Sequence, residues 1–206
     1  MDNNLEKIKN ALQSAAKALA RKNIKEKKEK FNTINPPQLF SLKNKEEIIE
    51  ARVTLDSQAL KIKYNDEKIS KKNEPVGQIS KSLYKIAEKI RYEKIGCEQY
   101  DGVKKNINAF YTKKITNSEI HSQNFIADAF EAYLRKKLMN FKVPNNKKKD
   151  FDRWDEFFNE KIMNKVLNLS KNINDQKQYS DNINSIIQDL DLKDQDTNPQ
   201  NVQNDE

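Results

Sequence analysis

The order of apolar and polar residues predicts helices along most of the chain. The clearest pattern runs through residues 80–111, where apolar side chains recur every three or four positions. The apolar stripe consists of Leu83, Ile86, Ala87 and Ile90, and the opposite polar face consists of Lys81, Lys85, Glu88, Lys89 and Arg91. Such periodicity is typical of an amphipathic helix. We expect this helix to end at a short turn marked by Gly96 and Gly102, after which a second helix begins.

Similar stripes predict helices on both sides of this pair. One covers residues 4–22, and its apolar face is rich in alanine and leucine. Two more follow residue 122, and a weaker one ends near residue 190. The side chains that we expect in the core are Leu83, Ile90, Phe130, Leu134, Leu138, Trp154 and Ile162.

Residues 41–64 allow two interpretations. The segments ARVTL and LKIKY alternate apolar and polar residues, as two short strands would. A helix is favoured, because Val53, Leu60 and Tyr64 share one helical stripe and no glycine or proline interrupts it. An isolated hairpin would also be only marginally stable.

Breaks in the periodicity divide the chain. Residues 23–40 contain a charge run and Pro36-Pro37, which stops a helix, and they predict a linker. Residues 191–206 are acidic with almost nothing to bury, and they predict a disordered tail. We therefore expect an all-α fold. An N-terminal amphipathic helix (1–22), docked or loosely attached across the linker, precedes a small bundle of five or six helices (41–190) and the acidic tail.

The composition favours a helical body with solvated surfaces. Of the 206 residues, 35% are hydrophobic and 34% are charged, and the net charge is +8. Such an excess can indicate a nucleic-acid partner, but the lysines are spread over the whole chain, so solvated helix faces are favoured. The start of the chain lacks a signal-peptide pattern, and no apolar run is long enough to cross a bilayer. We expect a cytoplasmic protein with no membrane partner.

The sequence contains no pattern that predicts catalytic, cofactor-binding or metal-binding residues. Glycine occurs only at 77, 96 and 102, which excludes phosphate-binding loops of the P-loop and dinucleotide types. His121 and Cys97 are each the only residue of their type, so they cannot build a His/Cys metal site or an internal disulfide. We interpret His121 as an exposed or capping side chain and Cys97 as a small residue at a helix junction.

Some apolar residues exceed what one buried stripe can hold. Phe157 and Phe158 point about 100° apart on a helix, so both cannot face the same stripe. The first helix, similarly, needs a surface to cover its apolar face. The residues that we predict to bind a partner are Leu5, Leu12, Leu19, Trp154 and Phe157.

Several segments resemble one family in the same order along the chain. EKIRYEKIG (88–96) with GVKKNI (102–107) is similar to the pattern E-x-x-R-x-E-x-I-G … G-V-x-x-N-[LI]. Further matching segments are NLEKIKNALQSAAKALA (4–20), LDSQALKIKYND (55–66), AFEAYLRKKL (129–138) and DRWDEFFNEKI (152–162). Together they resemble the N-terminal region of CobT, a subunit of ATP-dependent cobaltochelatase.

The resemblance implies a role in cobalamin biosynthesis. The chelatase inserts Co2+ into hydrogenobyrinic acid a,c-diamide with ATP hydrolysis. Its large, CobN-like subunit holds tetrapyrrole and metal, and its AAA+, CobS-like subunit hydrolyses ATP. The resemblance therefore implies a non-catalytic subunit that binds both partners and leaves ATP and Co2+ to them. Family members continue, after an acidic linker, into a von Willebrand A domain that these 206 residues do not contain.

Three alternatives stay open beside this one. The net charge of +8 is compatible with a basic helical nucleic-acid-binding protein. The helical pattern alone fits an adaptor without an enzymatic context. The missing von Willebrand A domain fits a truncated, non-functional CobT remnant.

Overall fold

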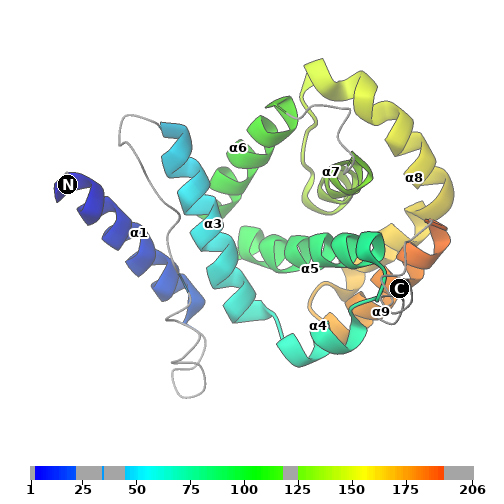
Figure 1. The fold of residues 1–206 in the computed structure, drawn as a ribbon, viewed down its shortest axis with the longest axis horizontal. Coiled ribbons are helices and arrows are strands. Elements are labelled where there is room, and N and C mark those ends of the chain that lie inside the picture. The colour runs from blue at the N-terminus through cyan, green and yellow to red at the C-terminus, as the bar shows by residue number, and fades with distance from the viewer. Residues whose placement is uncertain (1–2, 22–33, 35–44, 118–124, 193–206) are drawn as a thin grey trace, which may run out of the picture. The chain divides into compact units, whose positions relative to one another are not determined.

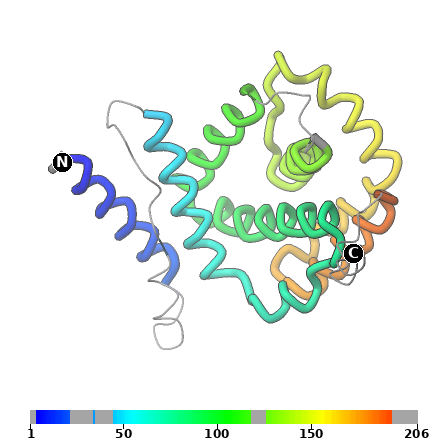
Figure 2. Tube along the Cα trace, viewed as in Figure 1, coloured from blue at the N-terminus to red at the C-terminus, as the bar shows by residue number. Residues whose placement is uncertain are grey.

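The computed structural model describes residues 3–21, 34, 45–117 and 125–192. All regular structure in these ranges is helical, which confirms the predicted all-α class (Figures 1 and 2). The described ranges contain eight α-helices, and seven of them lie within residues 41–190, where five or six were expected. One that the pattern missed is α4 (Glu67–Asn73), a short helix with no buried residue and therefore no apolar stripe. The chain divides into two compact units.

The first unit comprises Met1–Asn65, Lys89–Glu119 and Phe141–Lys148. It holds α1 (Asn3–Ala20), α3 (Lys45–Tyr64), the second half of α5 (Gln78–Gln99), α6 (Asp101–Asn117) and the 3-10 turn η1 (Asn145–Lys147). Helix α3 lies between α1 and α6 (Figures 1 and 2). Its continuous helical backbone confirms the helix interpretation and excludes the pair of strands for this segment.

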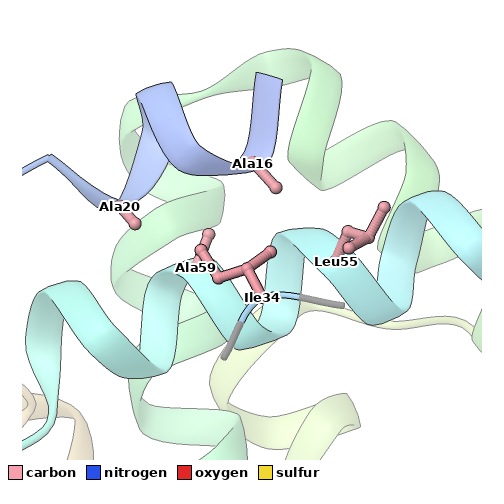
Figure 3. Close-up of a cluster of buried hydrophobic side chains, with 5 residues drawn as sticks. All are labelled: Ala16, Ala20, Ile34, Leu55 and Ala59. Atoms are coloured by element: carbon pink, nitrogen blue, oxygen red, sulfur yellow. The ribbon is translucent and has the colours of Figure 1, made fainter. Parts of the chain in front are cut away.

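Helix α1 is docked on α3 through small side chains. Figure 3 shows Ala16 and Ala20 of α1 facing Leu55 and Ala59 of α3, with Ile34 beside them. All five side chains are at most 1% exposed. Alanines let the two helix backbones approach closely, and Gln13 Nε2 donates to the Ile34 carbonyl at 2.8 Å. Apart from Ile34, the predicted linker lies outside the described residues, as does most of the predicted tail.

The turn expected at Gly96 and Gly102 falls elsewhere. Helix α5 continues through Gly96 to Gln99, and Gly102 lies in the first turn of α6. A Cβ atom built on Gly96 would lie 2.6 Å from Leu60 Cδ1, closer than carbon atoms pack. Gly96 therefore permits the close approach of α5 to α3, whereas a Cβ on Gly102 would meet no atom within 4 Å.

The second unit comprises Asp66–Glu88, Ile120–Asn140 and Lys149–Glu206. It holds α4, the first half of α5, α7 (Phe125–Met139), α8 (Lys148–Leu169), the 3-10 turn η2 (Ser170–Asn172) and α9 (Gln176–Asp189). Asp175 is the N-cap of α9, because its side chain accepts a hydrogen bond from Gln178 N–H at 3.0 Å.

The predicted polar face of α5 is wrong at two positions. Glu88 is 5% exposed and Arg91 is 1% exposed. In the second unit, Glu88 accepts hydrogen bonds from Gln176 and Ser180 of α9. In the first unit, Arg91 Nη2 donates to the Tyr64 carbonyl at the end of α3 at 3.0 Å. The helix dipole also favours a positive charge at this end of the helix. Both charges are buried because each has hydrogen-bond partners there.

Six of the seven predicted core side chains are buried: Leu83, Ile90, Phe130, Leu134, Leu138 and Ile162. The prediction that Trp154 is buried was wrong, since this side chain remains partly exposed.

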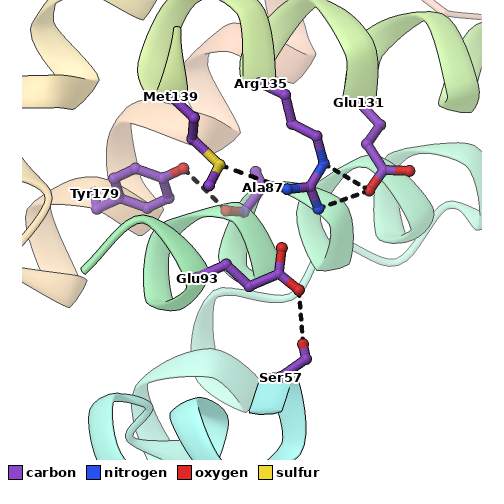
Figure 4. A network of polar contacts seen from close by, with 7 residues as sticks. All are labelled: Ser57, Ala87, Glu93, Glu131, Arg135, Met139 and Tyr179. Atoms are coloured by element: carbon purple, nitrogen blue, oxygen red, sulfur yellow. Dashed lines mark hydrogen bonds and ion pairs between the residues drawn. The ribbon is translucent and has the colours of Figure 1, made fainter. Parts of the chain in front are cut away.

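Buried charge also occurs in α7, where Arg135 pairs with Glu131 at 2.9 Å and contacts Met139 Sδ (Figure 4). Figure 4 also shows Tyr179 donating to the Ala87 carbonyl at 2.9 Å.

Candidate partner-binding site

Helix α8 has a buried stripe and a flank that the stripe leaves uncovered. The buried residues are Phe151, Phe158, Ile162, Val166 and Leu169. They recur at intervals of three or four residues, as the core face of an amphipathic helix does. Trp154 and Phe157 lie beside this stripe and are both partly exposed.

An aromatic cluster supports the two exposed rings. Phe158 packs against Phe130 and Tyr133 of α7, with ring centroids 5.8 and 5.1 Å apart. Trp154 lies 5.8 Å from Phe158 and 5.7 Å from Phe157, the latter edge to face. Such geometries add stability beyond the area that the rings bury. Trp154 and Phe157 are therefore held in place although they reach the surface.

Polar contacts fix α7 against α8 below this cluster. Tyr133 OH donates to Asn159 Oδ1 at 3.0 Å, and Lys136 forms an ion pair with Asp155. Burial, together with the negative charge of Asp155, raises the pKa of Tyr133 to about 12. Tyr133 is thus neutral at physiological pH and is able to donate its hydrogen bond.

A surface pocket of about 530 Å³ opens over the exposed rings. Its lining residues are Ile126, Arg153, Trp154, Phe157, Lys161, Leu190, Asp191 and Leu192, and they come from α7, α8 and the end of α9. Most of the lining surface is apolar, and the charged residues of the lining are Arg153, Lys161 and Asp191. This composition and size are typical of a site that binds apolar side chains or small molecules.

The end of α9 completes the pocket wall. Leu190 is 2% exposed and its N–H bonds back to the carbonyls of Ile186 and Ile187. Asp191 has φ of 48°, a left-handed conformation that ends the helix and that aspartate tolerates better than most residues. The chain turns there, and Leu192 lines the pocket.

The sequence pattern predicted Trp154 and Phe157 but no other residue of the pocket lining. Ile126 and Leu190 belong to helical stripes and look like ordinary core residues, while Arg153 and Lys161 look like solvated charges. Only tertiary packing brings α7, α8 and the end of α9 together. The doubled aromatic at Phe157 and Phe158 was the one available signal.

The other predicted partner-binding residues lie on α1. Leu12 and Leu19 pack against the cluster formed by α1, Ile34 and α3, and remain partly exposed. Leu5 is also partly exposed. Their binding of a partner stays a prediction.

The residues considered for metal or thiol chemistry form no site in the described ranges. Cys97 is buried within α5, and His121 lies outside the described residues. No group of three or more His, Cys, Asp or Glu side chains with metal-binding geometry occurs among the residues that the structure describes. None of the described helices combines the length and apolarity needed to cross a lipid bilayer.

Three of the segments that carry the family resemblance, those in α3, α5 and α6, meet inside the first unit. Ser57 of α3 donates to Glu93 of α5 at 2.7 Å, and both are buried (Figure 4). Asp56 accepts from Arg52 Nε at 3.0 Å and from Asn106 of α6 at 3.5 Å. Burial raises the pKa of Asp56, and the nearby Arg52 opposes that rise. These motif residues therefore join α3, α5 and α6 internally.

Comparison with known proteins identifies one family. A family model described as "Cobalamin biosynthesis protein CobT" matches residues 2–206. No solved structure matches the chain.

Proposed function

Because the chain belongs to the CobT family of cobalamin biosynthesis proteins, we propose that it acts as a non-catalytic assembly subunit of an ATP-dependent cobaltochelatase. In this role it binds the AAA+ subunit, which hydrolyses ATP, and the large subunit, which holds Co2+ and hydrogenobyrinic acid a,c-diamide. Both Co2+ and the corrin ring are substrates of the complex and are held by the partners.

The aromatic pocket on α8 is the observation that carries this proposal. Trp154 and Phe157 are partly exposed yet fixed by the rings beneath them, and aliphatic side chains surround them. Interfaces gain most of their binding energy from a few such aromatic residues in pockets. The motif residues Ser57 and Glu93, in contrast, are buried and bond to each other, which favours a structural role for them.

Co-purification with the AAA+ subunit tests the proposal. Phe157→Ala and Trp154→Ala should each weaken binding by about tenfold or more, because both remove an aromatic residue from the centre of the pocket. Leu167→Ala is the matched control, since Leu167 is an apolar residue on the same helix, 53% exposed and outside the pocket. Its binding should equal that of the wild type.

Circular dichroism and melting curves should confirm that all three variants fold. Wild-type binding by both pocket variants would exclude the pocket as the site. A wild-type chain that never binds the AAA+ subunit at moderate salt would overturn the proposed function itself.

A further inference from the structure

The cations beside the pocket follow a regular spacing on α8. Lys149, Arg153, Phe157 and Lys161 succeed one another at intervals of four residues, so they lie along one inclined row of the helix surface. Lys149, Arg153 and Lys161 are exposed. Arg153 and Lys161 line the pocket on either side of Phe157, about 12 Å apart along the helix axis.

Among the described residues, Arg153 and Lys161 have no carboxylate partner, unlike two nearby lysines. Lys136 pairs with Asp155, and Lys165 pairs with Asp189 at 2.6 Å. Within the part of the chain that the structure describes, neither Arg153 nor Lys161 forms an ion pair. Lys161 instead lies 5.5 Å from the centre of the Phe157 ring. Asp191 is the acid among the lining residues, so the lining carries a net positive charge.

We propose that this pocket binds an acidic amphipathic helix of a partner protein. Aliphatic side chains of that helix enter between Trp154, Phe157 and Leu192, while its carboxylates pair with Arg153 and Lys161. A separation of about 12 Å corresponds to carboxylates about eight residues apart on the incoming helix. Recognition by apolar anchors at helical spacing, flanked by charge, is an established way of binding a helix in a groove.

The apolar part of the pocket lining favours a protein ligand over a nucleic acid. Ile126, Leu190 and Leu192 contribute an aliphatic surface to the pocket lining. A phosphate backbone has no apolar group to place against such a surface, whereas a leucine-bearing helix buries its own apolar face there. The inference rests on the proposed function only in assigning the helix to a chelatase subunit.

Tryptophan fluorescence measures occupancy of the pocket directly, because Trp154 is the single tryptophan of the chain. The probe is a synthetic helical peptide of about 18 residues, with glutamates about eight positions apart and leucines between them. Binding should move the Trp154 emission to shorter wavelength. Peptides with lysine in place of glutamate, or serine in place of leucine, should bind about tenfold more weakly or not at all.

Charge reversal supplies the decisive control. The double variant Arg153→Glu, Lys161→Glu should lose about tenfold in affinity for the glutamate peptide and gain affinity for the lysine peptide. Both substituted residues are exposed, so the variant should keep wild-type circular dichroism. Equal binding of glutamate and lysine peptides, equal binding of the serine peptide, or saturation by a single-stranded oligonucleotide in their place would each overturn the inference.

The AAA+ subunit separates this inference from the proposed function. If the peptide binds and also displaces the AAA+ subunit, both stand. If the peptide binds but the AAA+ subunit never does, the proposed function fails and the pocket inference survives. If the AAA+ subunit binds and the peptide does not, the inference fails alone.

Discussion

At the residue scale, Gln176 connects more backbone and side-chain groups than any apolar residue of α9 could. Its amide oxygen accepts from Asp66 N–H at 2.7 Å, and its Nε2 lies 2.9 Å from Ser70 Oγ and 3.1 Å from Glu88 Oε2. One buried amide thus joins the start of α4, α5 and α9 within the second unit.

Gln176→Ala should lower the free energy of unfolding by about 1–3 kcal/mol, because it leaves a buried carboxylate without one of its hydrogen-bond donors. Denaturant titration measures the change. Gln178→Ala on the same helix is the control, since that side chain is exposed, and it should stay within about 0.5 kcal/mol of the wild type. Equal stability of the two variants would contradict the prediction.

Asp56 makes a pH-dependent contribution to stability. The side chain is fully buried, and one of its carboxylate oxygens has no hydrogen-bond partner among the residues that the structure describes. Burial raises its pKa above the ordinary value of 3.8, although Arg52 and Asn106 oppose the rise. A raised pKa means that the folded state holds this proton more tightly than the unfolded state does. The resulting stabilisation is complete below pH 3.8 and is lost as pH rises through the folded-state pKa.

Asp56→Asn removes this titration. The difference in unfolding free energy between variant and wild type should therefore move in favour of Asn as pH rises from 3.8 through the folded-state pKa. Urea titrations at a series of pH values measure the difference. A difference that stays constant with pH would show that Asp56 titrates normally.

The burial of apolar residues was easier to predict from the sequence than that of charged residues. Leu83, Ile90 and Phe130 are buried as predicted, because a helical stripe marks the side that must leave water. Glu88 and Arg91 were assigned to a solvated face because their residue types usually lie there. Their burial depends on partners in α9 and at the end of α3, which are distant in sequence.

At the scale of helices, Gly96 sets how closely α5 approaches α3. Gly96→Ala should cost about 1–3 kcal/mol of stability, because the new methyl group overlaps Leu60. Gly102→Ala is the matched control. It adds the same methyl group where nothing lies within 4 Å, and alanine favours helices over glycine, so it should be neutral or stabilising.

A second substitution tests the cause. Leu60→Ala destabilises the wild type by opening a cavity, but in the Gly96→Ala background it also removes the overlap, so the combined cost should be less than the sum. Thermal unfolding of the four proteins of this cycle measures the coupling. Additive costs would mean that Leu60 is not what Gly96 accommodates.

Helix boundaries were less predictable than helices. The stripe through Val53 and Leu60 was sufficient to identify α3 as a helix. The short α4 has no buried residue, so no stripe could reveal it, and its start depends on Asp66 accepting from Lys68 N–H at 2.8 Å. The break after α5 falls at Tyr100 and not at either glycine, because Gly96 serves packing.

At the scale of the whole molecule, the sequence predicted two of the eight residues that line the candidate site, Trp154 and Phe157. Phe157 could be found because it lies about 100° from Phe158 on the helix, so one stripe cannot hold both. Ile126 and Leu192 join the pocket lining only in the folded second unit. No local pattern connects those residues to α8.

The purified chain should neither hydrolyse ATP nor insert Co2+ into a corrin by itself. Its sequence contains no P-loop, and with a single histidine and a single cysteine it offers few of the ligands that cobalt prefers. Phosphate release and corrin absorbance measure the two activities.

With the AAA+ and large subunits added, Co2+ insertion should rise with the amount of this chain and level off at a fixed ratio, as expected of a stoichiometric subunit. Phe157→Ala should shift that rise to higher concentration, because it weakens binding without touching a reacting group. ATP turnover or Co2+ insertion by the isolated chain, or insertion by the partners that is indifferent to its presence, would contradict an assembly role.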